Sequence, residues 1–274
     1  MATLRRSLAQ GICAFALLVP SALLAQEDKD STAAAIEMYR EMLADGNPAE
    51  LHELRGEELW TTPRGPKNAS LEKCDLGLGP GKVQGAYAQL PRYFPDTDKV
   101  EDLESRLVTC MTTLQGFDRE EVTKKPYGSI SYQADMEALA AYVVGQSRGL
   151  PMAVPQKHPK EKEAYAIGKE IFYYRAGPYD FACATCHGED GKRIRLQDLP
   201  NLTEKKGAQF AYTTWPAYRV SQGELRTMQW RLWDCFRQQR FPEPKYISDA
   251  TIALTTFLAV NANGAKYDGP AIKR

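Results

Sequence analysis

The sequence predicts a mainly α-helical protein, because six stretches are helix candidates, the first of them with Ser31 or Thr32 as N-cap and Gly46 just past its end. Clusters of proline and glycine at 62–66 and 77–85 mark loops between such stretches. A second observation, the similarity of the two halves of the chain, indicates that one helical unit occurs twice. The six predicted helices cover 31–45, 98–114, 135–146, 160–174, 224–238 and 248–261.

The N-terminus has the pattern of an export signal. Arg5 and Arg6 precede an apolar run at 12–24, and the small residue Ala25 is followed by a polar segment. This order of charged, apolar and small residues is typical of a cleaved signal peptide, whereas a membrane-spanning helix needs about 20 apolar residues. We therefore expect residues 1–25 to be a signal peptide that is removed on export to the periplasm, and an uncleaved anchor is the weaker interpretation.

The internal repeat is found when the two halves are laid over each other. In each half a leucine lies three residues before an aromatic residue and ten before a glycine, and an arginine lies four residues before a cysteine. The leucine pattern alone is weak evidence, since any two apolar helices look alike, and the Arg-x-x-x-Cys match is stronger. The matching pairs are Leu139 and Leu254, Tyr142 and Phe257, Gly149 and Gly264, Arg106 and Arg231, and Cys110 and Cys235.

The chain contains a Cys-x-x-Cys-His motif, formed by Cys183, Cys186 and His187. Two thiols at this spacing can each add to a haem vinyl group, and the histidine that follows can bind the iron, so the motif predicts one covalently bound haem c. A zinc site would need a second Cys/His pair nearby, and a thioredoxin-like redox pair usually follows a strand of a βαβ unit. Neither is found here, and an exported protein suits haem attachment.

The first half lacks a complete motif of this kind, because Leu71, Cys74 and Asp75 occupy the corresponding positions. We therefore predict two cytochrome c-like domains related by internal duplication, of which the first has lost its haem. The haemless domain would cover 26–153 and the haem-binding domain 154–274, with a proline-containing linker at 154–159.

Cys74 and Cys110 have no haem to serve in this scheme. Their counterparts Cys186 and Cys235 would both lie beside the haem, so Cys74 and Cys110 should lie close to each other in space. A disulfide between them would close a loop of about 36 residues and stabilise the fold by roughly 3–4 kcal/mol in the chain-entropy model. The alternative is a pair of buried thiols, which an oxidising compartment disfavours.

The ligand on the other side of the iron is open to two interpretations. Met228 is the methionine that follows the haem motif and is the usual type of ligand in small electron-transfer cytochromes. Cys235 competes with it, because Arg231 lies one helical turn earlier on the same face and a nearby cation favours the thiolate. A guanidinium can also bind an oxyanion. His52 and His158 are expected to be surface residues, and a buried, inert Cys235 is the plainer alternative.

The stretch 70–81, the Cys183-x-x-Cys186-His187 motif and the segment 231–237 together resemble the SoxA family of the bacterial sulfur-oxidising (Sox) system. The resemblance implies a partner cytochrome, SoxX, and a carrier protein, SoxYZ, to whose cysteine thiosulfate is coupled oxidatively with electrons passing to a cytochrome. It further implies iron ligation by His187 and Cys235, a persulfide on Cys235 and substrate binding by Arg231. The missing first motif points to the one-haem members.

We therefore expect a periplasmic L-cysteine S-thiosulfotransferase subunit. The alternative is a plain electron-transfer cytochrome without sulfur chemistry, for which an arginine-flanked cysteine has no evident use. A third interpretation, a scaffolding role for the haemless half, is compatible with the first, since that half can dock SoxX. Further basic residues near the site in the sequence are Lys192, Arg195, Arg237, Arg240 and Lys245.

Overall fold

The computed structural model describes Ala34, Met38 and the ranges 46–124, 126–127, 132–194 and 197–273. The expected signal peptide 1–25, nearly all of the predicted helix 31–45 and Arg195 lie outside these residues. Residues from Gly46 onward belong to one compact unit. The boundary between 153 and 154 therefore separates two halves of a single body, and their status as two domains stays a prediction.

The first half begins with α2 (Ala49–Thr61), which the sequence analysis did not predict. A 3-10 turn, η1 (Tyr87–Gln89), leads into a hairpin of β1 (Arg92–Phe94) and β2 (Lys99–Glu101). Helix α3 (Leu103–Cys110) continues into the π-helical turn η2 (Met111–Gln115). The short α4 (Arg119–Thr123) and the longer α5 (Tyr132–Gly145) complete this half.

The second half starts with α6 (Pro159–Tyr173) and the short α7 (Cys183–His187). The strands β3 (Arg193–Ile194) and β4 (Gln197–Asp198) follow, and then α8 (Lys205–Thr213). A second hairpin, β5 (Ala217–Arg219) and β6 (Glu224–Arg226), precedes α9 (Met228–Gln238) and α10 (Asp249–Asn261). The last strand, β7 (Ala271–Lys273), pairs in parallel with β5.

The predicted helices 98–114 and 224–238 were wrong at their beginnings, because each starts with the second strand of a hairpin. The helix proper begins only after an N-cap: the Asp102 side chain accepts a hydrogen bond from the Ser105 amide, and the Thr227 hydroxyl accepts one from the Trp230 amide. Ser248 caps α10 in the same way. The loops expected at 62–66 and 77–85 contain no helix or strand of regular length.

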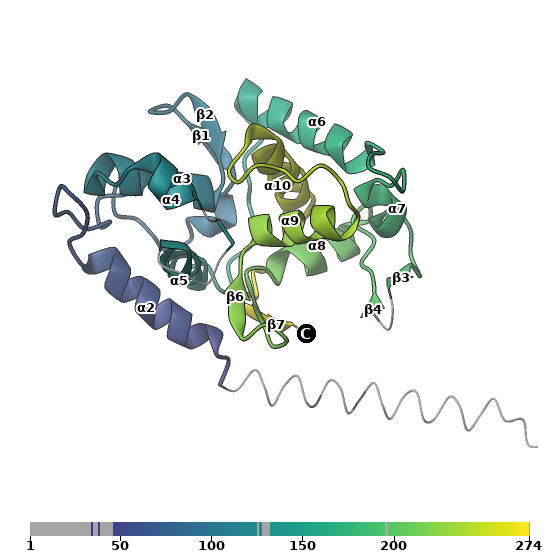
Figure 1. Cartoon of the computed structure of the whole chain (residues 1–274), viewed down its shortest axis with the longest axis horizontal. Helices are drawn as coiled ribbons and strands as arrows, with labels where there is room; N and C mark the ends of the chain where they lie inside the picture. Colours follow the sequence, from purple (N-terminus) through teal and green to yellow (C-terminus); the bar gives the residue numbers. More distant parts are fainter. Residues whose placement is uncertain are drawn as a thin grey trace, which may run out of the picture. The chain divides into compact units, whose positions relative to one another are not determined.

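Each half contains a pair of helices that cross at a glycine (Figure 1). Helix α2 packs on α5, where a Cβ added to Gly56 would lie 2.0 Å from the carbonyl oxygen of Ala138. Helix α6 packs on α10, where a Cβ added to Gly168 would lie 2.0 Å from the carbonyl oxygen of Ala253. Backbones approach this closely only where a side chain is missing, so both helix pairs depend on the same device.

The hairpins and the helices after them also correspond. The register of the first hairpin pairs Arg92 with Glu101, and that of the second pairs Ala217 with Arg226. An N-cap and a helix follow each hairpin directly, so Cys110 and Cys235 occupy the same position on α3 and α9. The two halves therefore share one order of elements around the Arg-x-x-x-Cys sequences.

The halves are joined by a common core, to which both contribute buried residues such as Leu107 and Leu254. The predicted linker is tied down at its start, since the backbone of Val154 exchanges two hydrogen bonds with the Asn263 side chain. Tyr87 and its counterpart Tyr212 stack with ring centroids 6.3 Å apart. Among the described residues, no helix combines the length and the apolar character that crossing a bilayer requires.

Candidate functional site

The Cys-x-x-Cys-His motif forms α7, a short helix with no fully buried residue. Its first turn is fixed by the Thr185 hydroxyl, which accepts a hydrogen bond from the Ala182 amide at 2.9 Å. The thiols of Cys183 and Cys186 are both free and partly exposed. Desolvation raises the pKa of the Cys183 thiol to about 12, and the nearby Cys235 sulfur adds to this shift. The sulfur atoms of Cys183, Cys186 and Cys235 therefore lie near one another.

The His187 ring is held in one orientation by the protein backbone. Its Nδ1 lies 2.9 Å from the carbonyl oxygen of Pro200. A histidine that donates through Nδ1 offers Nε2 to a metal, and such a backbone partner fixes both the tautomer and the ring orientation. Desolvation lowers the pKa of His187, and the positive charge of Arg231 lowers it further. The ring is therefore kept in the neutral, ligating form.

Arg231 and Cys235 lie one turn apart on α9, as the sequence predicted. Buried Asp234 organises the basic side chains of this helix. Its carboxylate accepts hydrogen bonds from Arg237 at 2.7 Å, from Gln238 at 2.6 Å and from Arg231 at the longer distance of 3.3 Å. Arg231 also lies over the Trp215 ring, 5.9 Å from its centroid. Its guanidinium is held near the site with most of its donors left for a ligand.

The Cys235 thiol is free and partly exposed. Arg231 and Arg219 both lower the pKa of Cys235, as expected for cations near a sulfur. Desolvation has the larger effect and raises that pKa overall, so the arginine expected from the sequence acts in the expected direction but is outweighed by burial. The thiolate needs a further positive partner, and a metal ion at the sulfur supplies one.

Met228, the alternative to Cys235 as an iron ligand, lies in different surroundings. Met228 is the first residue of α9 and packs against a cluster of Trp215, Ala217 and Trp230. It also lines a small cavity of about 20 Å³ between the halves. Seven residues of helix separate Met228 from Cys235, which amounts to about 10 Å along the axis. The two side chains therefore cannot serve the same position.

The remaining histidines have local structural roles. His158 caps α6, where its Nδ1 accepts a hydrogen bond from the Lys160 amide, and its ring stacks on Tyr93 with centroids 3.6 Å apart. His52 lies on α2 near Tyr218, and burial lowers its pKa. The expectation that both are ordinary surface residues was too simple, because both rings are packed.

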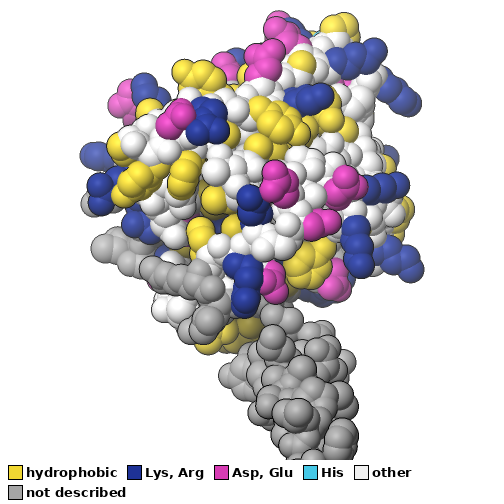
Figure 2. Space-filling view, turned by 90° about the vertical axis from the view of Figure 1, so that its right-hand side faces the viewer, with side chains coloured by type: hydrophobic (Ala, Val, Ile, Leu, Met, Phe, Trp, Pro, Cys, Tyr) yellow, Lys and Arg dark blue, Asp and Glu magenta, His cyan; other side chains and the backbone are white. Residues whose placement is uncertain are grey.

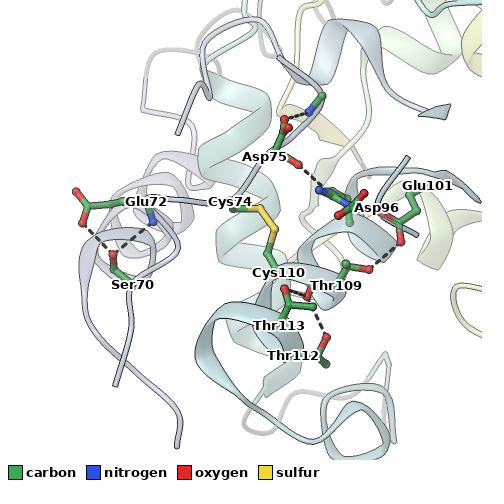
Figure 3. Close-up of a disulfide and its surroundings, with 12 residues drawn as sticks. Ser70, Glu72, Cys74, Asp75, Asp96, Glu101, Thr109, Cys110, Thr112 and Thr113 are labelled. Carbon is green, nitrogen blue, oxygen red and sulfur yellow. Dashed lines mark hydrogen bonds and ion pairs between the residues drawn. A yellow bond between two sulfur atoms is a disulfide. The ribbon is translucent and has the colours of Figure 1, made fainter. Parts of the chain in front are cut away.

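The predicted disulfide between Cys74 and Cys110 is confirmed, with the two Cα atoms 5.6 Å apart (Figure 3). Leu71, at the position of Cys183, is fully buried. Asp75 replaces His187, and its carboxylate accepts hydrogen bonds from the amides of Gly77 and Gly79. The positions that form α7 in the second half thus correspond to a disulfide-bonded loop in the first half.

Sequence reasoning missed Pro200, Asp234 and Arg219. Pro200 and Asp234 orient other residues and carry no motif of their own. Arg219 lies on β5, half-buried, and the charges of Arg231, Asp234 and Cys235 all act on it. A signal for Arg219 was present, because extending the repeat upstream from Arg231 aligns it with Phe94.

The side of the molecule that carries α7, β3 and β4 in Figure 1 faces the viewer in Figure 2. Hydrophobic side chains lie there among basic and acidic ones (Figure 2). Large apolar residues around α7 are exposed, including Tyr174, Tyr179 and Ile194. Lys192, named from the sequence, forms an ion pair with Glu189 at 3.1 Å.

The chain matches the family model of the SoxA/TsdA cytochrome c domain over residues 55–152 and 167–267. It is 58% identical over 250 residues to the L-cysteine S-thiosulfotransferase subunit SoxA of Hydrogenophilus thermoluteolus, and the match covers 91% of each protein. The chain belongs to the SoxA family. The resemblance inferred from the motifs is confirmed.

More distant SoxA proteins agree. The SoxA subunit of Hydrogenobacter thermophilus is 36% identical over 228 residues, with coverage of 83% of this chain and 82% of that protein. The crystal structure of SoxXA from P. pantotrophus has a TM-score of 0.68 at 27% identity, and the match covers 83% of this chain and 79% of that one. The mainly helical fold is thus that of a SoxA cytochrome c protein.

A cytochrome c domain implies haem c, and the residues present fit that group. Cys183 and Cys186 are free thiols at the attachment spacing. His187 has one ring nitrogen bonded to Pro200 and the other available. Around them the partly buried apolar residues Leu202 and Phe236 pack on the core and can line a planar cofactor.

Proposed function

We propose that this SoxA protein is the subunit of a periplasmic L-cysteine S-thiosulfotransferase that couples thiosulfate oxidatively to a cysteine of the SoxYZ carrier. The observation that carries the proposal is the free Cys235 thiol. The charges of Cys183, Cys186, Arg231 and Arg219 all interact with it, so the thiol lies near both the attachment cysteines and two arginines.

One haem c would be held in the second half, by thioether bonds to Cys183 and Cys186 and by the Nε2 of His187. Cys235 would be a further ligand of the iron. In the first half both cysteines are consumed by a disulfide and an aspartate replaces the histidine, which supports the loss of a second haem. When bound, haem c supplies a one-electron acceptor next to the reacting sulfur.

The chain's own residues provide binding and nucleophilic chemistry. Arg231 would bind the sulfonate end of thiosulfate through charge-assisted hydrogen bonds and direct the terminal sulfur toward Cys235. A bond then forms between the terminal sulfur and the sulfur carried on Cys235, with the loss of two electrons to a cytochrome acceptor. The resemblance implies that this sulfur on Cys235 is a persulfide.

The second step is a thiol–disulfide exchange. The carrier thiolate, after losing its proton, attacks the former terminal sulfur of thiosulfate, and the bond from that sulfur to the Cys235 adduct breaks. The carrier leaves as a cysteine bearing an S–SO₃ group, and Cys235 regains its starting state. No further oxidation is needed in this step, so the two electrons leave in the first one.

SoxX is the partner that we propose, because the structural relative is a SoxXA complex. A second haem on SoxX would help to accept the second electron, since one haem takes one electron at a time. Residues 1–25 would direct the export of this chain to the periplasm. There it would meet SoxX and SoxYZ.

The test is thiosulfate coupling to SoxYZ by the haem-loaded complex with Arg231→Ala, followed by the mass of the carrier. We expect coupling to fall to background while the haem spectrum is largely retained. Arg175→Ala is the matched control, because Arg175 is an exposed arginine of the same half paired with Asp180. Coupling at the wild-type rate by Arg231→Ala would contradict the proposed role of the arginine. A wild-type complex that reduces its acceptor but never modifies SoxYZ would favour plain electron transfer.

A further inference from the structure

Arg219, at the end of β5, is a second arginine near Cys235, and no hydrogen-bond acceptor or carboxylate among the described residues pairs with its guanidinium. Its Nε is buried and makes no hydrogen bond. Among the described residues, no carboxylate forms an ion pair with its guanidinium, although Arg226 on the neighbouring strand is paired with Glu137 at 2.9 Å. A buried guanidinium nitrogen without an acceptor is costly, which points to an acceptor that comes from outside the chain.

The corresponding place in the first half shows what a structural arginine needs. There Arg106 lies over the ring of Phe94 at 4.0 Å from its centroid. Arg106 also forms ion pairs with Asp96 at 2.8 Å and Glu101 at 3.1 Å. Its Nε donates to the Asp75 carbonyl oxygen at 2.6 Å.

Every one of these partners is replaced in the second half. The shared hairpin register places Arg219 at the position of Phe94 and Arg226 at the position of Glu101. Ser221, two residues after Arg219, takes the position of Asp96. Each exchange makes the site more positive. A place that encloses and neutralises its arginine in one half therefore becomes a basic site around Cys235 in the other.

The orientation of Arg219 is fixed by aromatic and strand contacts. Its guanidinium lies over the Trp230 ring, 6.0 Å from the centroid, while Arg231 lies over Trp215. Trp215 and Trp230 belong to one buried cluster, so both arginines lie against rings of the same cluster. On the other edge of β5, the parallel register places Lys273 of β7 opposite Arg219.

We propose that Arg219 is a second anion-binding residue of the site, which together with Arg231 holds the sulfonate end of thiosulfate next to Cys235. This inference rests on the proposed function. Two guanidiniums suit a tetrahedral oxyanion with three oxygens, because each can donate two parallel hydrogen bonds. The mutual repulsion of Arg219 and Arg231 is relieved when the anion binds between them.

The experiment measures binding apart from turnover, with sulfate as an unreactive tetrahedral dianion. Sulfate affinity of the haem-loaded complex would be determined calorimetrically for the wild type, Arg219→Gln and Arg219→Lys. Arg119→Gln is the control for net charge, since Arg119 is exposed at the start of α4 in the first half. We expect Arg219→Gln to weaken sulfate binding about 10- to 100-fold, the usual effect of a charged hydrogen bond. Arg219→Lys should recover part of the loss, and Arg119→Gln should bind like the wild type.

Turnover adds a readout that a merely structural role would not move. The KM for thiosulfate should rise in Arg219→Gln by more than kcat falls, because the residue holds the anion and does not react. Equal sulfate affinity in Arg219→Gln and wild type would overturn the inference, whereas the proposed function would stand if the wild type still modifies SoxYZ. A shifted haem midpoint potential with unchanged sulfate affinity would assign Arg219 to a haem propionate and would also overturn it.

Discussion

The two halves of the molecule use the same Arg-x-x-x-Cys sequence in opposite ways. In the first half Arg106 is buried and bonded to two carboxylates and a carbonyl, and Cys110 is bonded to Cys74. In the second half Arg231 has one long ion pair with Asp234, and Cys235 is a free thiol. The order of elements is the same, so the two halves differ here in whether these residues have partners within the chain.

The comparison also shows which neighbours decide the outcome. At the positions of Cys183 and His187 the first half has buried Leu71 and Asp75, whose carboxylate accepts hydrogen bonds from loop amides. Around Cys235 the carboxylates at the matching positions are gone and Arg219 and Arg226 replace apolar and acidic residues. The proposed site around Cys235 thus differs from the corresponding place in the first half mainly by the partners that are missing there.

The largest effect is expected from Cys235→Ser. Thiosulfate coupling should fall by roughly 10⁴-fold or more, as when a reacting nucleophile is removed. The haem should stay attached, because Cys183 and Cys186 are intact, while its spectrum reports a changed ligand. Coupling activity and the haem stain of a denaturing gel would check both points. Retention of a tenth of wild-type coupling would be incompatible with sulfur transfer through Cys235.

Arg106→Gln should destabilise the fold without touching the chemistry. Glu101 is 5% exposed and would be left without its cation, and breaking such a pair typically costs about 3–5 kcal/mol. Arg231→Gln, at the matching position, should change the free energy of unfolding by less than about 1 kcal/mol, because its pair with Asp234 is long and partly exposed. Denaturant unfolding of both variants would check this, and equal losses would remove the contrast between the halves.

Removing the disulfide should have a slightly smaller effect. The variant with both Cys74→Ala and Cys110→Ala should lose about 3–4 kcal/mol of unfolding free energy, since the loop of 36 residues is no longer closed in the unfolded chain. Thiosulfate coupling per folded molecule should be unchanged. A loss of coupling in protein that is shown to be folded would mean that the disulfide has a part in the reaction.

The smallest effect concerns Glu104, whose counterpart in the second half is Gln229. Burial and the nearby Asp102 raise the pKa of Glu104 to about 8, although Tyr246 donates a hydrogen bond to it at 2.9 Å. The fold prefers the protonated form, so this group stabilises most at low pH and its contribution is lost as the pH rises from about 4.5 toward 8.

Glu104→Gln should remove this dependence. Between pH 5.5 and 8.5 the wild type should lose at least about 1 kcal/mol more unfolding free energy than the variant, which corresponds to less than one unit of pKa difference. Unfolding curves at the two pH values would check it. Parallel losses in both proteins would show that Glu104 is charged in the folded state.

Much of the site was predictable because its chemistry is written in short motifs. Spacing and resemblance point to Cys183, Cys186, His187, Arg231 and Cys235, whose roles stay predictions. The repeat predicted the pairing of Cys74 with Cys110, which the structure contains. The helices with side-chain caps, such as α10 after Ser248, were also found. These features depend on residues that are close in the sequence.

The features that were missed depend on distant contacts. Helix α2 has few apolar periodic positions, and it is held by the approach of Gly56 to α5. The three-residue strands β2 and β6 were absorbed into helices, since the hairpin partner that defines them lies several residues upstream. The desolvation that outweighs the arginines and raises the pKa of Cys235 likewise comes from the folded chain as a whole.

The most direct test of the contrast between Cys110 and Cys235 is the intact mass of the haem-loaded protein, before and after incubation with thiosulfate and oxidised cytochrome, and again after reduction. The account predicts one haem and additional sulfur that thiosulfate supplies or replenishes and that a reductant removes, with the sulfur mapped to Cys235. One haem with no added sulfur under any of these conditions would contradict it and leave Cys235 as a plain ligand of an electron-transfer cytochrome.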